Sequence, residues 1–110
     1  MPKTLPREII RWIHSLDLSI PYKDSKRDLN NGFLIADIFS RYYPYELSMH
    51  GFDNSHNTIR KKNNWYLLAK FFKQKNLRFD PSEYDEIKDG NFNQLVEFMI
   101  KVYERLTKRK

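Results

Sequence analysis

The chain has 110 residues and no cysteine, so it has room for one hydrophobic core and cannot form disulfides, thiolate zinc sites or a cysteine nucleophile. Lysine and arginine outnumber aspartate and glutamate by 20 to 14, and the net charge of +6 favours an acidic partner by long-range attraction. No stretch approaches the roughly 20 apolar residues of a membrane span, and the N-terminus lacks the apolar segment of a signal peptide. We therefore expect a soluble, intracellular protein with a single domain over residues 1–110 and an ordered core over residues 5–106.

A first helix is predicted to begin near Pro6, where the missing backbone N–H costs nothing, with Thr4 available as its cap. The apolar residues that share one side of this helix are Leu5, Ile9, Trp12, Ile13 and Leu16. The basic residues on the opposite side are Arg7, Arg11 and His14. Residues 17–31 break this pattern with polar and turn-forming residues, which predicts a loop.

The next helix is predicted over residues 33–43, after Asn31 and Gly32 and before Pro44, which cannot continue a helix. Its apolar residues cover a wide arc, which indicates shelter on more than one side, and they are Leu34, Ile35, Ile38, Phe39 and Tyr42. The connection over residues 44–57 is predicted to be long, with a short helical turn.

A third long helix, residues 58–75, is apolar over most of its circumference and is therefore expected to be central. Its apolar residues are Trp65, Leu68, Ala69 and Phe72 on one face, with Leu67 and Phe71 on a second flank. The remaining strip consists of Lys62, Tyr66, Lys70 and Lys73, whose spacings of four, four and three residues align them on one exposed line. Such a line is a candidate binding site, although a solvated helix face has the same pattern.

A short helix is predicted to begin at Asp80-Pro81-Ser82-Glu83, and Asn91 is expected to cap a last helix. The residues that mark the buried face of this last helix are Phe92, Leu95, Val96, Met99, Tyr103 and Leu106. No alternation of apolar and polar residues indicates a sheet. The sequence therefore predicts an all-α bundle of four principal helices, with one or two short helices and long loops.

Several motifs resemble one known family. In the first half they are Leu5-Pro6-Arg7-Glu8 before a helix with Trp12, then Lys26-Arg27-Asp28, Asn31-Gly32-Phe33-Leu34 and Arg41-Tyr42-Tyr43-Pro44. In the second half they are Asn63-Asn64-Trp65 with Leu68 and Phe71-Phe72, and Asp89-Gly90 before the last helix. Over residues 5–106 the chain resembles the calponin-homology-like domain of the sperm-flagellar and spermatogenesis-associated proteins, and most of all the spermatogenesis-associated branch.

This resemblance implies a calponin-homology fold of four principal helices that acts as a non-catalytic cytoskeletal binding module, without a cofactor. Members of this branch and the related end-binding proteins are linked to microtubules, whereas actin binders usually carry two such domains in tandem. The implied partners are microtubules or tubulin and other ciliary proteins, in the cytoplasm and in the axoneme of a cilium or flagellum. A protein–protein adaptor, or an actin-binding domain without microtubule contact, is the alternative.

The basic residues that we assign to a microtubule-binding surface are Lys23, Lys26, Arg27, Lys62, Lys70 and Lys73. The first three lie in the loop before the second helix, where the resemblance implies a filament-facing surface. Arg27 lies between Asp24 and Asp28, so local ion pairs explain it equally well. Lys3, Arg7 and Arg11 would extend the same positive field if the first helix packs beside this loop.

No residue set indicates catalysis. A glycine-rich phosphate loop, a serine elbow between glycines and a zinc-protease helix motif are all missing from the sequence. Asp85 and Glu86 form a solvated charge cluster more readily than an acid and base pair. His50, Asp53 and His56 are close in sequence, but they lie in a loop without cysteine, and a zinc site would need a third or fourth ligand from elsewhere, so we expect no metal site.

The large aromatic residues do not indicate a ligand site either. Trp12 and Trp65 lie on apolar helix faces, so both are expected to pack in the core. Neither a dedicated nucleic-acid motif nor an aromatic stacking platform stands out. We therefore expect no specific nucleic-acid binding and no membrane binding.

Overall fold

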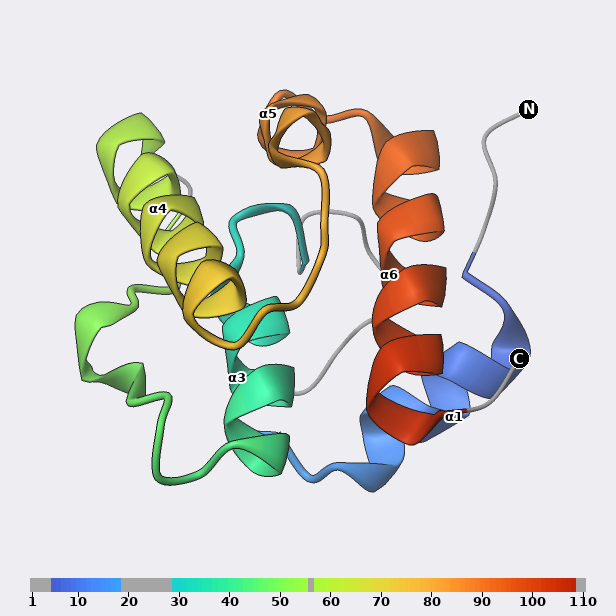
Figure 1. The fold of residues 1–110 in the computed structure, drawn as a ribbon. Coiled ribbons are helices and arrows are strands. Elements are labelled where there is room, and N and C mark those ends of the chain that lie inside the picture. The colour runs from blue at the N-terminus through green and yellow to red at the C-terminus, as the bar shows by residue number, and fades with distance from the viewer. Residues whose placement is uncertain (1–4, 19–28, 56, 109–110) are drawn as a thin grey trace.

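The structure is a computed structural model, which describes residues 5–18, 29–55 and 57–108. This part of the chain has no strand and consists of α1 (Arg7–Ser15), α3 (Phe33–Tyr42), the 3-10 turn η1 (Met49–Gly51), α4 (Thr58–Gln74), α5 (Pro81–Lys88) and α6 (Phe92–Thr107). In Figure 1, α6 stands on the right with α1 at its lower end, α4 slants across the upper left, and α5 is seen end-on at the top. The predicted all-α fold is confirmed, with α1, α3, α4 and α6 as the four principal helices.

Side-chain caps explain where the later helices begin. The side chain of Asn57 accepts hydrogen bonds from backbone N–H groups two and three residues on, at 2.9 and 3.4 Å. Asp80 accepts from the backbone N–H and the hydroxyl of the serine two residues on, at 3.0 and 2.9 Å, and these bonds lower the pKa of its carboxyl group. Asn91 caps α6 as predicted. α1 begins after Pro6 as expected, while its predicted cap, Thr4, lies outside the described residues.

The predicted loop over residues 17–31 is wrong at its C-terminal end. Leu29 and Asn30 are helical, and Leu29 is fully buried in the core. A single apolar residue between polar neighbours produces no period, so the sequence pattern did not reveal this core position. The segment 19–28 lies outside the described residues.

The buried face of α6 is wider than predicted. Phe98 and Val102 are fully buried although they were not predicted, and of the predicted positions Leu95, Val96, Met99 and Tyr103 are buried while Phe92 and Leu106 are partly buried. The cause is that α6 packs against both α1 and α5, so it is covered from two sides. The ring of Phe98 lies 5.9 Å from that of Trp65 on α4 and 6.1 Å from that of Tyr84 on α5, between ring centroids.

Aromatic rings from α3, α4, α5 and α6 form the centre of the core. Phe72 on α4 lies at 4.9 Å from both Phe39 on α3 and Phe79 in the connection to α5, measured between ring centroids. Phe79 lies 5.0 Å from Phe98 on α6. Each such pair adds about 0.5 to 1.5 kcal/mol beyond the area it buries. The packing therefore holds α4 rigidly in place, with only its outer side left to solvent.

Candidate functional site

The predicted strip on α4 is exposed along its whole length. We call Lys62, Tyr66, Lys70 and Lys73 the lysine strip, and all four side chains are exposed to solvent. Tyr66 is 65% exposed, which is unusual for an aromatic residue on the central helix of a core. The predicted exposure is confirmed, and the binding role of these residues stays a prediction.

The other cations of this region have partners. Arg60 lies 3.7 Å from the carboxylate of Asp53, and Lys61 donates to the carbonyl oxygen of Lys88 at 2.9 Å. Within the described ranges, no ion pair involves the lysines of the strip. They are therefore the cations of α4 that an external anion would meet first.

Positive and negative charges are separated between neighbouring helices. The charged residues of α4 are all basic, namely Arg60, Lys61, Lys62, Lys70 and Lys73. The charged residues of α5, which packs against α4, are mainly acidic, namely Glu83, Asp85, Glu86 and Lys88. Asp85 and Glu86 are exposed, as predicted, and Asp85 pairs with Lys88 at 3.0 Å. Among the described helices, α4 thus carries the largest net positive charge.

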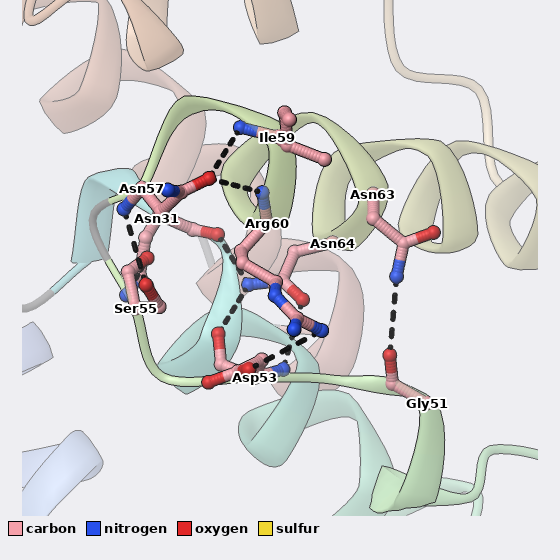
Figure 2. A network of polar contacts seen from close by, with 9 residues as sticks. All are labelled: Asn31, Gly51, Asp53, Ser55, Asn57, Ile59, Arg60, Asn63 and Asn64. Carbon is pink, nitrogen blue, oxygen red and sulfur yellow. Dashed lines mark hydrogen bonds and ion pairs between the residues drawn. The ribbon is translucent and has the colours of Figure 1, made fainter.

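A polar network fastens the N-terminal half of α4 to the loop before it, as Figure 2 shows. Asn64 is fully buried, and its amide oxygen accepts from the backbone N–H of Asp53 at 3.0 Å. Its amide nitrogen donates to the carbonyl oxygens of Asp53 at 2.7 Å and Asn31 at 2.9 Å. Asn31 in turn donates to the Asn54 side chain at 3.0 Å and to the carbonyl oxygen of Ser55 at 3.2 Å. The strip therefore rests on a helix whose inner side is fixed by hydrogen bonds.

Trp65 continues this attachment on the buried side of α4. Its indole N–H donates to the carbonyl oxygen of Asn30 at 2.9 Å, and its ring stacks on Tyr84 at 5.4 Å between centroids. Only 2% of its surface is exposed, which confirms the predicted core position. The Asn64-Trp65 pair thus holds the chain that enters α3 against α4.

Trp12 differs from Trp65 because it is only partly buried. Its indole N–H donates to the hydroxyl of Tyr42 at 2.9 Å, and its ring meets that of Tyr103 edge-on at 5.1 Å. Tyr42, predicted to lie in the apolar arc of α3, is 37% exposed at this place. A groove of about 600 Å³ opens beside these rings, lined by Glu8, Arg11, Trp12, Ser15, Tyr42, Tyr103, Leu106 and Thr107. Sequence analysis missed this groove because its aromatic residues come from α1, α3 and α6, which are far apart in the sequence and meet only in the folded protein.

The remaining predicted site residues lie outside the described ranges. They are Lys23, Lys26 and Arg27, together with Lys3 of the wider positive field. The structure therefore brings Lys62, Lys70 and Lys73 onto one line, and the contribution of the loop residues stays a prediction. Arg7 and Arg11 are exposed on α1.

The described part of the chain holds neither a candidate metal site nor a candidate membrane span. No group of three or more histidine, cysteine, aspartate or glutamate side chains in these ranges is placed to hold a metal ion. Of the histidines considered above, His56 lies outside the described residues. No helix in the described part is long and apolar enough to cross a membrane.

Comparison with known proteins agrees with the fold. A family model described as a CH-like domain in sperm protein matches residues 9–104, from α1 into α6. The chain is 31% identical over 62 residues to sperm flagellar protein 1 of Xenopus laevis and 29% identical over 70 residues to sperm flagellar protein 1 of Homo sapiens. These alignments cover 56% and 63% of this chain but 27% and 30% of the relatives, so the chain spans less than a third of their length. Because the family model covers nearly all of the helical bundle, the chain belongs to the family of CH-like domains found in sperm proteins.

Proposed function

We propose that this domain is a non-catalytic cytoskeletal binding module that attaches to microtubules of a cilium or flagellum through the lysine strip of α4. The observation that carries the proposal is a rigid helix whose charged residues are all basic, with three exposed lysines that have no ion-pair partner among the described residues. Family membership supports it, because relatives of the chain are named for the sperm flagellum.

The physical basis of this function is electrostatic complementarity. Tubulin exposes an acidic surface and acidic disordered tails, which a basic helix face attracts over a distance of about 10 Å at moderate salt. Lys62 and Lys73 are eleven residues apart on α4, which corresponds to about 16 Å along the helix axis. A face of this length contacts several carboxylates of one partner at once.

Co-sedimentation with polymerised tubulin tests the proposal. At low salt we expect the wild-type domain to pellet with microtubules, and Lys70→Glu to weaken the apparent affinity about tenfold. At about 0.15 M salt both affinities should fall and the difference should narrow, because exposed charges are screened. Lys70 is exposed, so the thermal unfolding curve of the variant should match that of the wild type.

A matched control separates a specific face from total charge. Arg7→Glu changes the net charge by the same amount on α1, which lies on the other side of the view from α4 (Figure 1). We expect this control to pellet nearly as well as the wild type. Absence of wild-type binding at low salt, or equal losses in both variants, contradicts the proposed site.

The loop lysines need their own experiment. If Lys23 and Lys26 belong to the same surface, Lys23→Glu and Lys26→Glu should weaken microtubule binding while helical content and melting temperature stay unchanged. If only the α4 variants lose affinity, the site is confined to the strip.

A protein–protein adaptor is the second candidate function, and the groove beside Trp12, Tyr42 and Tyr103 favours it. Aromatic rings that are partly exposed around a groove are typical of surfaces that anchor another protein.

Parallel sedimentation with actin filaments and binding to duplex DNA discriminate the remaining alternatives. Preference for actin, or equal binding to every polyanion, would contradict the microtubule assignment.

A further inference from the structure

The lysine strip is not purely electrostatic. Tyr66 lies between Lys62 and Lys70, four residues from each, and is 65% exposed. Ile59 lies three residues before Lys62, about one helical turn toward the N-terminus of α4. Its side chain is 75% exposed. Covering such a largely exposed side chain with a partner removes apolar surface from water and therefore favours binding.

The spacing of these side chains matches the repeat of an extended chain. On α4, side chains four residues apart are separated by about 6 Å along the axis, so Lys62, Tyr66 and Lys70 span about 12 Å. In an extended segment, every second side chain points the same way, with a repeat of about 6.6 Å and a span of about 13 Å over two repeats. The difference of about 1 Å is well within the reach of two flexible lysine side chains.

A helical partner fits this face less well. Helix pairing in a coiled coil requires two apolar positions per heptad on the contact face. The strip offers only one apolar position per heptad. Ile59 and Tyr66 are seven residues apart, and the exposed residues between them, which include Lys62 and Asn63, are polar. The face also lacks the array of aromatic side chains on which successive nucleic-acid bases stack.

We propose that the lysine strip recognises an extended acidic protein segment in which an apolar side chain lies between two carboxylates, at alternate positions. The carboxylates pair with Lys62 and Lys70, and the apolar side chain packs on the ring of Tyr66. This inference rests on the proposed function, because it takes the α4 strip as the contact face. The bonds that Asn64 makes behind the strip keep α4 in place before binding, which lowers the entropic cost of association.

Two short peptides of identical composition test this inference. The first, Gly-Glu-Ser-Leu-Ser-Glu-Gly, has leucine and both glutamates on one side when extended. The second, Gly-Glu-Leu-Ser-Ser-Glu-Gly, keeps the glutamates in place and turns leucine to the opposite side. In fluorescence anisotropy titrations with the whole domain, we expect the first labelled peptide to bind about fivefold more tightly than the second.

Variants of two exposed tyrosines connect the preference to Tyr66. Tyr66→Ala should abolish the difference between the peptides, and Tyr66→Phe should retain it because the ring remains. Tyr45 is 96% exposed on the loop after α3, so Tyr45→Ala is the matched control and should leave the preference unchanged. The salt dependence of binding should be the same for Tyr66→Ala and wild type, and shallower for Lys70→Ala.

The outcomes separate this inference from the proposed function. Equal binding of both peptides, or equally tight binding of an oligothymidylate with the same charge, overturns the inference, and persistent microtubule binding in that case leaves the proposed function standing. A clear preference for the first peptide without microtubule co-sedimentation supports the inference and rejects microtubules as the partner. A bound peptide that becomes helical by circular dichroism overturns the extended geometry.

Discussion

Asn64 is the residue on which the connection between α4 and the preceding loop depends most directly. Its amide oxygen accepts from the backbone N–H of Asp53, and its amide nitrogen donates to the carbonyl oxygen of the same residue. The side chain therefore acts like a backbone peptide group. The same amide also donates to Asn31, so one buried side chain satisfies three backbone groups. Buried polar groups without partners are costly, which makes this position intolerant of apolar replacement.

We therefore predict that Asn64→Ala lowers the free energy of unfolding by about 2 to 3 kcal/mol, because it leaves backbone groups without their partner. Urea denaturation followed by circular dichroism measures this loss. Asn63 is the control, since it is exposed and makes one bond of 3.3 Å to the carbonyl oxygen of Gly51. Asn63→Ala should change stability by less than about 0.5 kcal/mol. Equal effects of both substitutions would contradict the role assigned to Asn64.

Tyr84 is a second residue whose environment has a measurable consequence. Burial in the core raises the pKa of its hydroxyl to about 12, and the nearby carboxylates of Glu83 and Asp80 act in the same direction. Its hydroxyl donates only a long bond of 3.5 Å, to the carbonyl oxygen of Phe79. The folded protein therefore disfavours the tyrosinate form that an unfolded chain adopts above pH 10.

This raised pKa predicts a loss of stability at alkaline pH. Below about pH 10 the hydroxyl is neutral in both states, and between about pH 10 and 12 only the unfolded state releases the proton. In that window we expect the wild type to lose on the order of 2 kcal/mol more than Tyr84→Phe, which has no proton to release. Urea titrations at several pH values measure the difference. Parallel pH profiles for the two proteins would show that Tyr84 does not cause the loss.

At the scale of elements, the junction before α3 depends on a glycine. Gly32 has a φ of 85°, and a Cβ there would lie 3.3 Å from both Leu68 Cδ1 and Trp65 Nε1. Both the positive φ and the close approach of α4 disfavour larger residues at this position. This is why the connection into α3 can pass directly beneath α4.

Gly32→Ala should therefore cost about 2 to 3 kcal/mol of stability, combining backbone strain with the contact to α4. Gly90 separates the two effects, because its φ is 96° but a Cβ there would meet nothing within 4 Å. Gly90→Ala should cost about 1 kcal/mol, from backbone strain alone. Thermal melts of both variants provide the comparison, and equal losses would show that the contact with α4 is unimportant.

At the scale of the whole molecule, one core joins the helices. Rings from α3, α4, α5 and α6 meet around Phe72, while α1 packs its buried residues against α6. The molecule measures 32 × 28 × 26 Å, so no element lies far from this core. Charge, in contrast, is unevenly distributed, with cations on α4 and carboxylates on the neighbouring α5.

A shared core predicts a single cooperative unfolding transition. Near-UV circular dichroism reports the aromatic packing and far-UV circular dichroism reports the helices, and their thermal midpoints should coincide. Phe72→Ala removes a ring at the centre and should shift both midpoints downward together, with a loss of about 3 to 5 kcal/mol. A helical signal that outlasts the aromatic signal would indicate that the helices are stable without the common core.

The sequence by itself determined the helices α1, α3, α4, α5 and α6, the Asn91 cap of α6 and the exposure of the lysine strip. These properties are local, because a helix repeats every 3.6 residues and the strip is what remains when the apolar positions of α4 face inward. The expected boundaries of α3 and α4 each extend one residue beyond the observed ends, at Tyr43 and Lys75, which are the residues that cap those helices.

Only the tertiary structure decided the partners of Asn64, the burial of Leu29 and Phe98, and the aromatic groove beside Trp12. Each of these depends on segments that are distant in sequence and meet only after folding. Periodicity carries no information on such pairs, because it reports which side of a helix is apolar and not what covers that side. Local chemistry therefore specified the lysine strip, and long-range packing specified the rigid support behind it.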